Sequence, residues 1–134
     1  MRFPLAALCL IVCIGCDSSS SEVERVPQDV FVKAESVEFD GTALDENGRT
    51  EVFFNYVGSV EASCYGIRGY GYSDDGQRAM VTVTAQATAE SCPRRPSTVR
   101  IRIGLSVFFS QPGSYTYAFD RREDAPIEVR VTLP

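Results

Sequence analysis

The chain has 134 residues, with 13 lysines and arginines, 18 aspartates and glutamates and no histidine, so its formal charge at pH 7 is −5. This acidic balance argues against a nucleic-acid partner, because phosphates favour a basic protein face. The lack of histidine excludes Ser-His-Asp and Cys-His nucleophile systems and imidazole metal ligands. The length is enough for one domain with its own core, and we expect neither a metal nor another cofactor.

The N-terminal residues have the pattern of an export signal. Arg2 is the only charged residue before an uncharged, mostly apolar run over 5–15. That run is too short for a transmembrane helix, which needs about 20 apolar residues. A charged start, a short apolar run and small residues are typical of a secretory signal. Gly15 and Cys16 end this signal, and Asp17 and four serines follow at once.

The Gly15-Cys16 junction resembles that of a bacterial lipoprotein signal, in which a small residue precedes a cysteine that is lipid-modified and begins the mature chain. The resemblance implies cleavage after Gly15 and lipidation, including palmitate, on Cys16. It also implies a location in the cell envelope, lipid-anchored on the extracytoplasmic side of a bacterial membrane. Cys13 departs from the family pattern, which usually has leucine at that position. An ordinary secretory signal that ends near a cysteine is the alternative.

The five cysteines of the chain agree with this interpretation. Cys9 and Cys13 belong to the signal, and Cys16 receives the lipid. Cys64 and Cys92 remain as an even pair in an oxidising compartment. We expect them to form a disulfide, which stabilises by about 3–3.5 kcal/mol on the chain-entropy model. Two buried free thiols are the alternative. A metal site is not expected, because the spacing of the two cysteines is not that of metal ligands.

The composition divides the chain into three parts. Residues 1–15 are the expected signal peptide. Residues 16–28 are polar and serine-rich and are expected to form a flexible tether with a reach of about 20 Å. Residues 29–134 show no internal repeat and no second linker, so we expect them to form one domain.

Apolar and polar residues alternate from Val30 onward, which indicates strands with one dry face and one wet face. The expected strands cover 30–40, 50–57, 65–72, 79–89, 98–109, 115–119 and 127–133. The apolar parity changes within the first of them, which predicts a bulge near Glu35 and Ser36. Asn47-Gly48 is a strong hairpin signal between the first two strands.

Turn residues predict which strands pair. The turn at 111–114 predicts a hairpin in which Leu105 lies opposite Phe119. The loop after Phe119 predicts a second hairpin, with Ile127 opposite Phe119. A turn at 73–78 would place Tyr72 opposite Ala79, and the segment after residue 89 must then fold back to bring Cys92 to Cys64.

Seven or eight strands and no helix predict an all-β fold, a single antiparallel β-sandwich that is Ig-like in size and spacing. A small β-barrel is the alternative. Pro112 to Tyr117 reads Pro-Gly-Ser-Tyr-Thr-Tyr and resembles the entry to a late strand in Ig-like and fibronectin-like extracytoplasmic modules. That resemblance implies a structural role, with Tyr115 hydrogen-bonded across a corner.

Two acidic turns and two arginine pairs could bind ions, but a structural role is favoured for each. Residues 45–48 and 73–76 offer clustered oxygens, but calcium needs six to eight ligands on a longer loop, so turn formation is favoured. Arg94-Arg95 and Arg121-Arg122 could clamp an anion, but solubility at the surface is favoured on an acidic domain.

A glycine-rich strand over 65–72 is the candidate interaction surface. Its three glycines leave little to pack, which suits an edge strand better than a central one. Arg68, Tyr70 and Tyr72 are all even-numbered, so we expect them to share one face. A partner strand could add to such an edge. The two tyrosines and the arginine would then flank the contact, and these residue types are enriched at binding hot spots. Tyrosines that only cover a sheet edge are the structural alternative.

These features predict a membrane-anchored, non-enzymatic module with an envelope protein partner or a structural role. A small-ligand module that binds sugar or peptide with its Tyr70 and Tyr72 face is the alternative. An enzyme is the third interpretation. It is disfavoured because a serine nucleophile would need Lys33, the only lysine, as its base, and no carboxylate pair is placed across a cleft.

Overall fold

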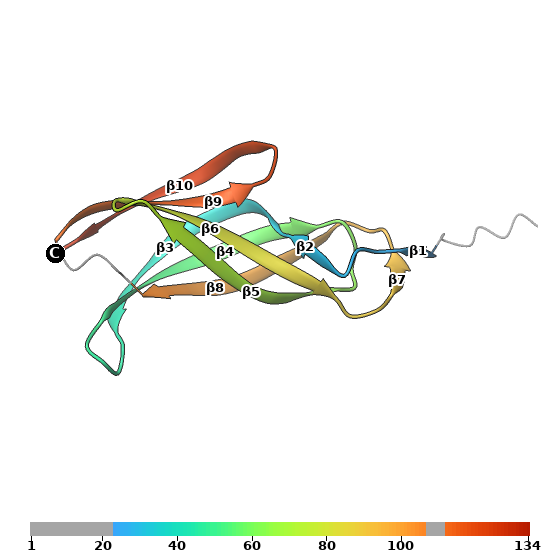
Figure 1. Ribbon diagram of the computed structural model, residues 1–134, viewed down its shortest axis with the longest axis horizontal. Helices are drawn as coiled ribbons and strands as arrows, with labels where there is room; N and C mark the ends of the chain where they lie inside the picture. Colours follow the sequence, from blue (N-terminus) through green and yellow to red (C-terminus); the bar gives the residue numbers. More distant parts are fainter. Residues whose placement is uncertain (1–22, 107–111) are drawn as a thin grey trace, which may run out of the picture.

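The computed structural model describes residues 23–106 and 112–134, and this part of the chain is all β (Figure 1). Its strands are β1 (Val23–Arg25), β2 (Asp29–Phe31), β3 (Lys33–Leu44), β4 (Thr50–Val60), β5 (Tyr65–Asp74), β6 (Arg78–Ala87), β7 (Ser91–Pro93), β8 (Ser97–Ser106), β9 (Gly113–Arg121) and β10 (Asp124–Leu133). No helix occurs in the described residues. The predicted all-β class is therefore confirmed.

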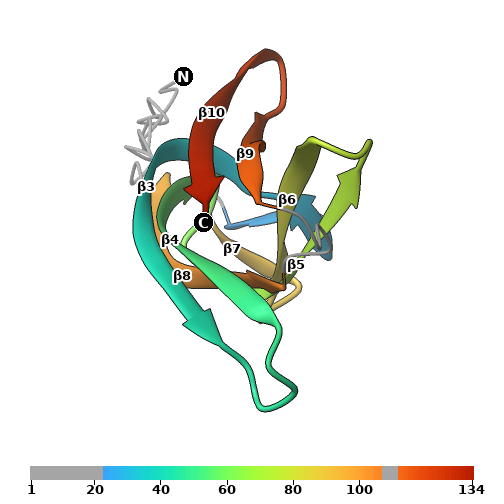
Figure 2. The ribbon, with the colours of Figure 1, turned by 90° about the vertical axis from the view of Figure 1, so that its left-hand side faces the viewer.

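Two main sheets pack face to face as a sandwich (Figures 1 and 2). One sheet has the order β3-β4-β8. The other has the order β10-β9-β6-β2. In that sheet β9 and β2 pair with one side of β6, and β5 pairs with the other side. A small sheet of β1 and β7 lies at one end (Figure 1). Within the described strands the sheets stay separate, so the barrel alternative does not apply.

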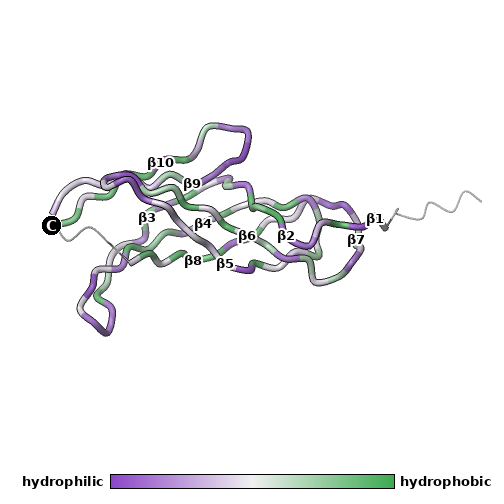
Figure 3. Tube along the Cα trace, viewed as in Figure 1, coloured by the Kyte–Doolittle hydropathy of each residue, from purple (hydrophilic) through white to green (hydrophobic). Residues whose placement is uncertain are grey.

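The core lies between the inward faces of the two sheets, as the alternation predicted. In β4, Val52, Phe54 and Tyr56 are buried, and the same alternation runs through β6. In β9, Tyr117 and Phe119 are buried, and Ala118 between them is buried as well. The Phe54 ring lies 5.0 Å from the ring of Tyr117 and 5.1 Å from that of Phe119, centroid to centroid. Hydrophilic residues instead gather at hairpin ends such as β3–β4 and β9–β10 (Figure 3).

One predicted hairpin is confirmed and the other is wrong. Phe119 lies opposite Ile127 in the β9–β10 ladder, as expected. Leu105 does not pair with Phe119, because β8 pairs with β4 in the first sheet, while β9 pairs with β6 and β10 in the second. Odd-numbered residues of β8 and β9 do face the same core. That agreement does not show that two strands pair, because strands that face each other across a sandwich also direct their apolar residues into one core. The turn proposed for 111–114 begins outside the described residues.

One pairing departs from the expected antiparallel pattern. The described strands pair antiparallel except for β6 and β9, which run parallel from Ala79 opposite Tyr117 to Val81 opposite Phe119.

The β3–β4 hairpin forms as predicted, but the expected single strand over 30–40 is divided, because β2 pairs with β6 in the other sheet. The register of β3 and β4 shifts between Ala34 and Ser36, where a bulge was expected. Gly48 closes the β3–β4 turn with a φ of 74°, a conformation that favours glycine. Asp45 supports the same turn, because its Oδ1 accepts backbone hydrogen bonds from Asn47 at 2.8 Å and Arg49 at 2.7 Å.

The β5–β6 hairpin is longer than predicted. Tyr72 lies opposite Val81 instead of Ala79, because β5 continues to Asp74 and the turn is correspondingly tighter. Gly76 has a φ of 104° within that turn. The Oδ1 of Asp75 accepts a hydrogen bond from the Arg78 N–H at 3.1 Å and so fixes the turn.

Cys64 and Cys92 form the expected disulfide, with their Cα atoms 6.0 Å apart. The fold-back that this bond required is β7, which contains Cys92. Cys64 sits just before β5, and its carbonyl accepts a hydrogen bond from the Thr88 N–H at 2.9 Å. The disulfide therefore joins the end of the β5–β6 hairpin to the small β1–β7 sheet.

The folded unit begins earlier than residue 29, so the expected tether over 16–28 is too long. Val23–Arg25 pairs with Ser91–Pro93. Val26 is buried in the core, and the Tyr65 hydroxyl donates a hydrogen bond to the Pro27 carbonyl at 2.7 Å.

Candidate functional site

The two sides of the sandwich differ in how the sheets meet. On one side, β3 lies against β9 and β10. On the other, the edge strands β5 and β8 border an open groove with a volume of about 630 Å³. Its lining consists of Tyr70, Gly71, Tyr72, Asp74, Gly104, Leu105 and Ser106. We call it the β5/β8 groove.

Tyr70 bridges the two edges. Its hydroxyl donates a hydrogen bond to the Gly104 carbonyl at 3.1 Å and accepts one from the Gly104 N–H at 3.3 Å. The side chain remains 41 % exposed. An exposed tyrosine of β5 is thereby held to the backbone of the opposite sheet, with part of its ring open to a ligand.

A bulge in β5 decides which way its side chains point. The register with β6 shifts between Ile67 and Gly69, so Arg68 is the extra residue. Ile67, Tyr70 and Tyr72 consequently lie opposite the buried residues of β6, on the inner face. The expectation that Arg68 shares a face with Tyr70 and Tyr72 is wrong, because alternation cannot continue through an extra residue.

Arg68 instead serves the outer face. Its Nη1 lies 2.9 Å from the Asp29 Oδ1, and this ion pair joins β5 to β2 across β6. Both side chains are more than half exposed, at 59% and 53%. Such an ion pair contributes only about 0.2–1 kcal/mol.

Tyr72 lies deeper than Tyr70. It is half-buried and packs against the core. Burial, followed by the nearby Asp74 carboxylate, raises the pKa of its hydroxyl. The groove therefore has an exposed tyrosine, a half-buried neutral tyrosine and a carboxylate along β5.

The backbone of β5 also faces the groove side. The Val83 carbonyl accepts a hydrogen bond from Val32, and the Ala87 N–H donates one to Gln28, so odd-numbered residues of β6 point away from β5. In an antiparallel ladder the residues opposite them also point away from the shared boundary. Tyr70 lies opposite Val83, so its N–H and C=O are directed outward at the sheet edge.

The expectation that this strand forms an edge is confirmed within the described residues, because β5 pairs there with β6 alone. A Cβ atom added at Gly69 or Gly71 would meet nothing within 4 Å. The glycines therefore leave open space on the outer face of β5.

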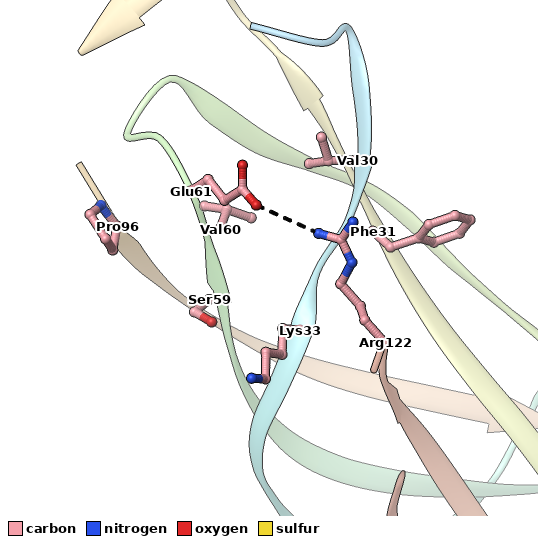
Figure 4. A pocket seen from close by; sticks show the side chains of 8 residues that line it. All are labelled: Val30, Phe31, Lys33, Ser59, Val60, Glu61, Pro96 and Arg122. Carbon is pink, nitrogen blue, oxygen red and sulfur yellow. Dashed lines mark ion pairs between the residues drawn. The ribbon is translucent and has the colours of Figure 1, made fainter. Parts of the chain in front are cut away.

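A second, smaller pocket of about 170 Å³ lies near the β9–β10 turn (Figure 4). It is lined by Val30, Phe31, Lys33, Ser59, Val60, Glu61, Pro96 and Arg122. Ligand pockets usually measure about 300–1,000 Å³. Its volume makes this pocket a weaker candidate than the β5/β8 groove.

Both cations of that pocket already have acidic partners. Arg122 has a φ of 63°, and its Nη1 lies 3.9 Å from the Glu61 Oε1 (Figure 4). The Lys33 Nζ lies 2.7 Å from Asp124, and this hydrogen bond lowers the pKa of the Asp124 carboxyl. An incoming anion would compete with these carboxylates.

The acidic turns act as turns, since Asp45 and Asp75 accept backbone hydrogen bonds from their own loops. Across 23–106 and 112–134, the acidic and cysteine side chains form no group of three or more that could hold a metal ion. Tyr115 is buried, with its hydroxyl beside Gly113. Its expected corner hydrogen bond stays a prediction.

Gly15 and Cys16 lie outside the described residues. No helix in the described part of the chain is long and apolar enough to cross a membrane. Cleavage after Gly15 and lipidation of Cys16 therefore stay predictions.

Sequence reasoning missed the β8 half of the groove. Gly104 lies opposite Phe53, and a Cβ atom added at Gly104 would come within 2.8 Å of that ring. A lone glycine in a regular apolar alternation was a signal for a close approach. The sequence alone does not say what approaches Gly104, because the pairing of β8 with β4 cannot be deduced from it.

No family model, curated protein or solved structure matches this chain. The functional assignment therefore depends on the residues and geometry of the chain itself.

Proposed function

We propose that the protein is a lipid-anchored, non-enzymatic interaction module of a bacterial cell envelope, and that its binding surface is the β5/β8 groove. The anchor is Cys16, on the resemblance of the Gly15-Cys16 junction to a lipoprotein signal. The observation that carries the binding surface is the meeting of two open sheet edges at Tyr70. Tyrosine is enriched among residues that dominate binding energy, and outward backbone groups accept an added strand.

The anchor places the β1–β7 end of the sandwich next to the membrane. Residues 17–22 separate Cys16 from Val23, the first residue of β1. Even fully extended, this connection spans at most about 25 Å. The groove is lined by the ends of β5 and β8 that lie away from Cys64 and β7, so the anchor leaves it accessible to a partner.

Binding of a small ligand is the second candidate for the same groove. Its volume of about 630 Å³ lies within the usual range for ligand sites. Tyr70 offers a partly exposed ring for stacking on a sugar or peptide, and Asp74 offers a carboxylate.

Co-purification from detergent-solubilised envelopes tests the protein-partner proposal. Tyr70→Ala and Tyr70→Ala/Tyr72→Ala change the groove, and Arg130→Ala changes an exposed arginine of β10 as a matched control. The groove variants should lose the partner that wild type and Arg130→Ala retain, while their melting temperatures show that they stay folded. Retention by both folded groove variants contradicts the proposal.

A further inference from the structure

The edge strands of the two main sheets differ in regularity. Register shifts interrupt β3, β5 and β10 where they pair with their neighbours. β8 pairs with β4 from Ser97 to Ser106 without a shift. Bulges twist a strand and hinder the addition of another, so they protect an edge. Among the described long edge strands, β8 alone lacks this protection.

The backbone groups of β8 alternate in direction. Gly104 points its N–H and C=O away from β4, since both bond the Tyr70 hydroxyl. In an antiparallel ladder every second residue points the same way, so Thr98, Arg100 and Arg102 also direct their groups outward. No described strand pairs with β8 on that side. Tyr70 caps the run at Gly104 and leaves Thr98 to Arg102 for a partner.

The side chains along this run are basic. Arg100 and Arg102 are exposed on the outer face of β8. Arg102 is held in place, because its Nε bonds Asp40 at 2.8 Å and its guanidinium lies 4.0 Å from the centre of the Phe53 ring. Arg100 points from the same face beside it. A domain with an acidic overall charge therefore presents arginines along its most regular edge.

We propose that an extended segment of a partner protein, carrying acidic side chains, pairs with β8 from Thr98 to Arg102. Its carboxylates lie beside Arg100, while Arg102 keeps its ion pair with Asp40, and its backbone completes the outward hydrogen bonds. This inference rests on the proposed function, extends its binding surface from the β5/β8 groove along β8, and adds which chemistry is recognised. A second copy fits less well, because pairing β8 with itself brings arginines together, and like charges opposite one another destabilise a sheet.

Two capped peptides are suitable probes: Thr-Val-Glu-Val-Glu-Val-Thr and its counterpart with lysine in place of glutamate. Titration of each into the lipid-free mature domain is followed by NMR and by backbone amide hydrogen exchange. The glutamate peptide should slow exchange at Thr98, Arg100 and Arg102. It should bind roughly fivefold more tightly than the lysine peptide, as expected for one or two cross-strand charge pairs.

Two variants separate charge from backbone pairing. Arg100→Glu should weaken the glutamate peptide and reverse the preference, whereas Arg130→Glu, at an exposed arginine of β10, should change neither. Thr98→Pro keeps both arginines and removes one outward N–H, a position where an edge strand tolerates proline. It should lower the affinity for the glutamate peptide while the melting temperature confirms a folded domain.

Three results would overturn this inference. Slowed exchange at the Tyr70 and Tyr72 amides instead would move the partner to β5 and leave the proposed function standing. Slowed exchange at β8 without peptide, together with dimerisation, would make a second copy the occupant. No slowing at β8 by either peptide at millimolar concentration would reject β8 as a docking edge, while co-purification still decides the proposed function independently.

Discussion

The ring of Phe54 in β4 lies 5.0 Å from the ring of Tyr117 in β9, so one aromatic pair joins the two sheets across the core. Phe54 is fully buried and Tyr117 is only 3% exposed. Burial, with smaller contributions from Tyr115 and Tyr72, raises the pKa of Tyr117 from 10.0 to about 12. Burial also raises the pKa of Tyr56, which packs beside the same cluster.

This pair predicts a loss of stability at alkaline pH. The pKa of Tyr117 is raised in the folded protein. The contribution of this side chain to the free energy of unfolding is therefore complete below its unfolded-state pKa of 10.0 and is lost as pH rises towards about 12. Tyr117→Phe should flatten the dependence of the unfolding free energy on pH in that window, measured by urea unfolding. An unchanged slope in a Tyr56→Phe/Tyr117→Phe variant would show that these hydroxyls do not control alkaline stability.

The disulfide should contribute strongly to stability. It closes a loop with a sequence separation of 28, for which the chain-entropy model gives about 3.5 kcal/mol. Cys64→Ala/Cys92→Ala should lower the unfolding free energy by about this amount in urea. Reduction should destabilise the wild type similarly and leave the double variant unchanged. Equal stability of oxidised and reduced wild type would contradict the prediction.

Gly58 should resist substitution. A Cβ atom there would lie 2.5 Å from the Val32 Cγ1 and 2.7 Å from the Tyr56 Cε1, in the packed core. Gly58→Ala should therefore cost about 1–3 kcal/mol, as overpacking does. Gly69→Ala is the matched control, because its Cβ would meet nothing within 4 Å. The prediction fails if the two variants melt at the same temperature.

Much of the core could be predicted because alternation depends on local sequence. Val52, Phe54 and Tyr56 in β4 are buried as the pattern indicated, and Phe119 pairs with Ile127. The pairing of β8 could not be predicted, since a strand with one dry face can use a hydrogen-bonded neighbour in either sheet.

The candidate site was predicted only in part. The glycines of β5 indicated an edge, and Tyr70 is exposed there. The bulge at Arg68 was missed because nothing in the local alternation marks an extra residue in a glycine-rich strand. Gly104 was missed because its role depends on Tyr70, which is distant in sequence and meets it only across the sandwich.

Lipidation of Cys16 can be tested separately from the fold. Cys16→Ser should release the domain from the membrane fraction or leave the precursor unprocessed, because the proposed acceptor sulfur is missing. Cys9→Ser is the control, since that residue lies in the expected signal away from the Gly15-Cys16 junction and should leave fractionation unchanged. Metabolic labelling with a palmitate analogue should mark wild type and Cys9→Ser. Labelled, membrane-bound Cys16→Ser would contradict the lipoprotein interpretation.

Site-specific photo-crosslinking in intact cells tests the central claim, that the side between β5 and β8 holds the partner of a tethered module. A photoreactive amino acid replaces Asp74 or Thr98 at that side, and Arg130 on β10 as the control; all three residues are exposed. We expect one discrete crosslinked product from positions 74 and 98 and none from position 130. Equal crosslinking at all three positions, or crosslinking at position 130 alone, would contradict it.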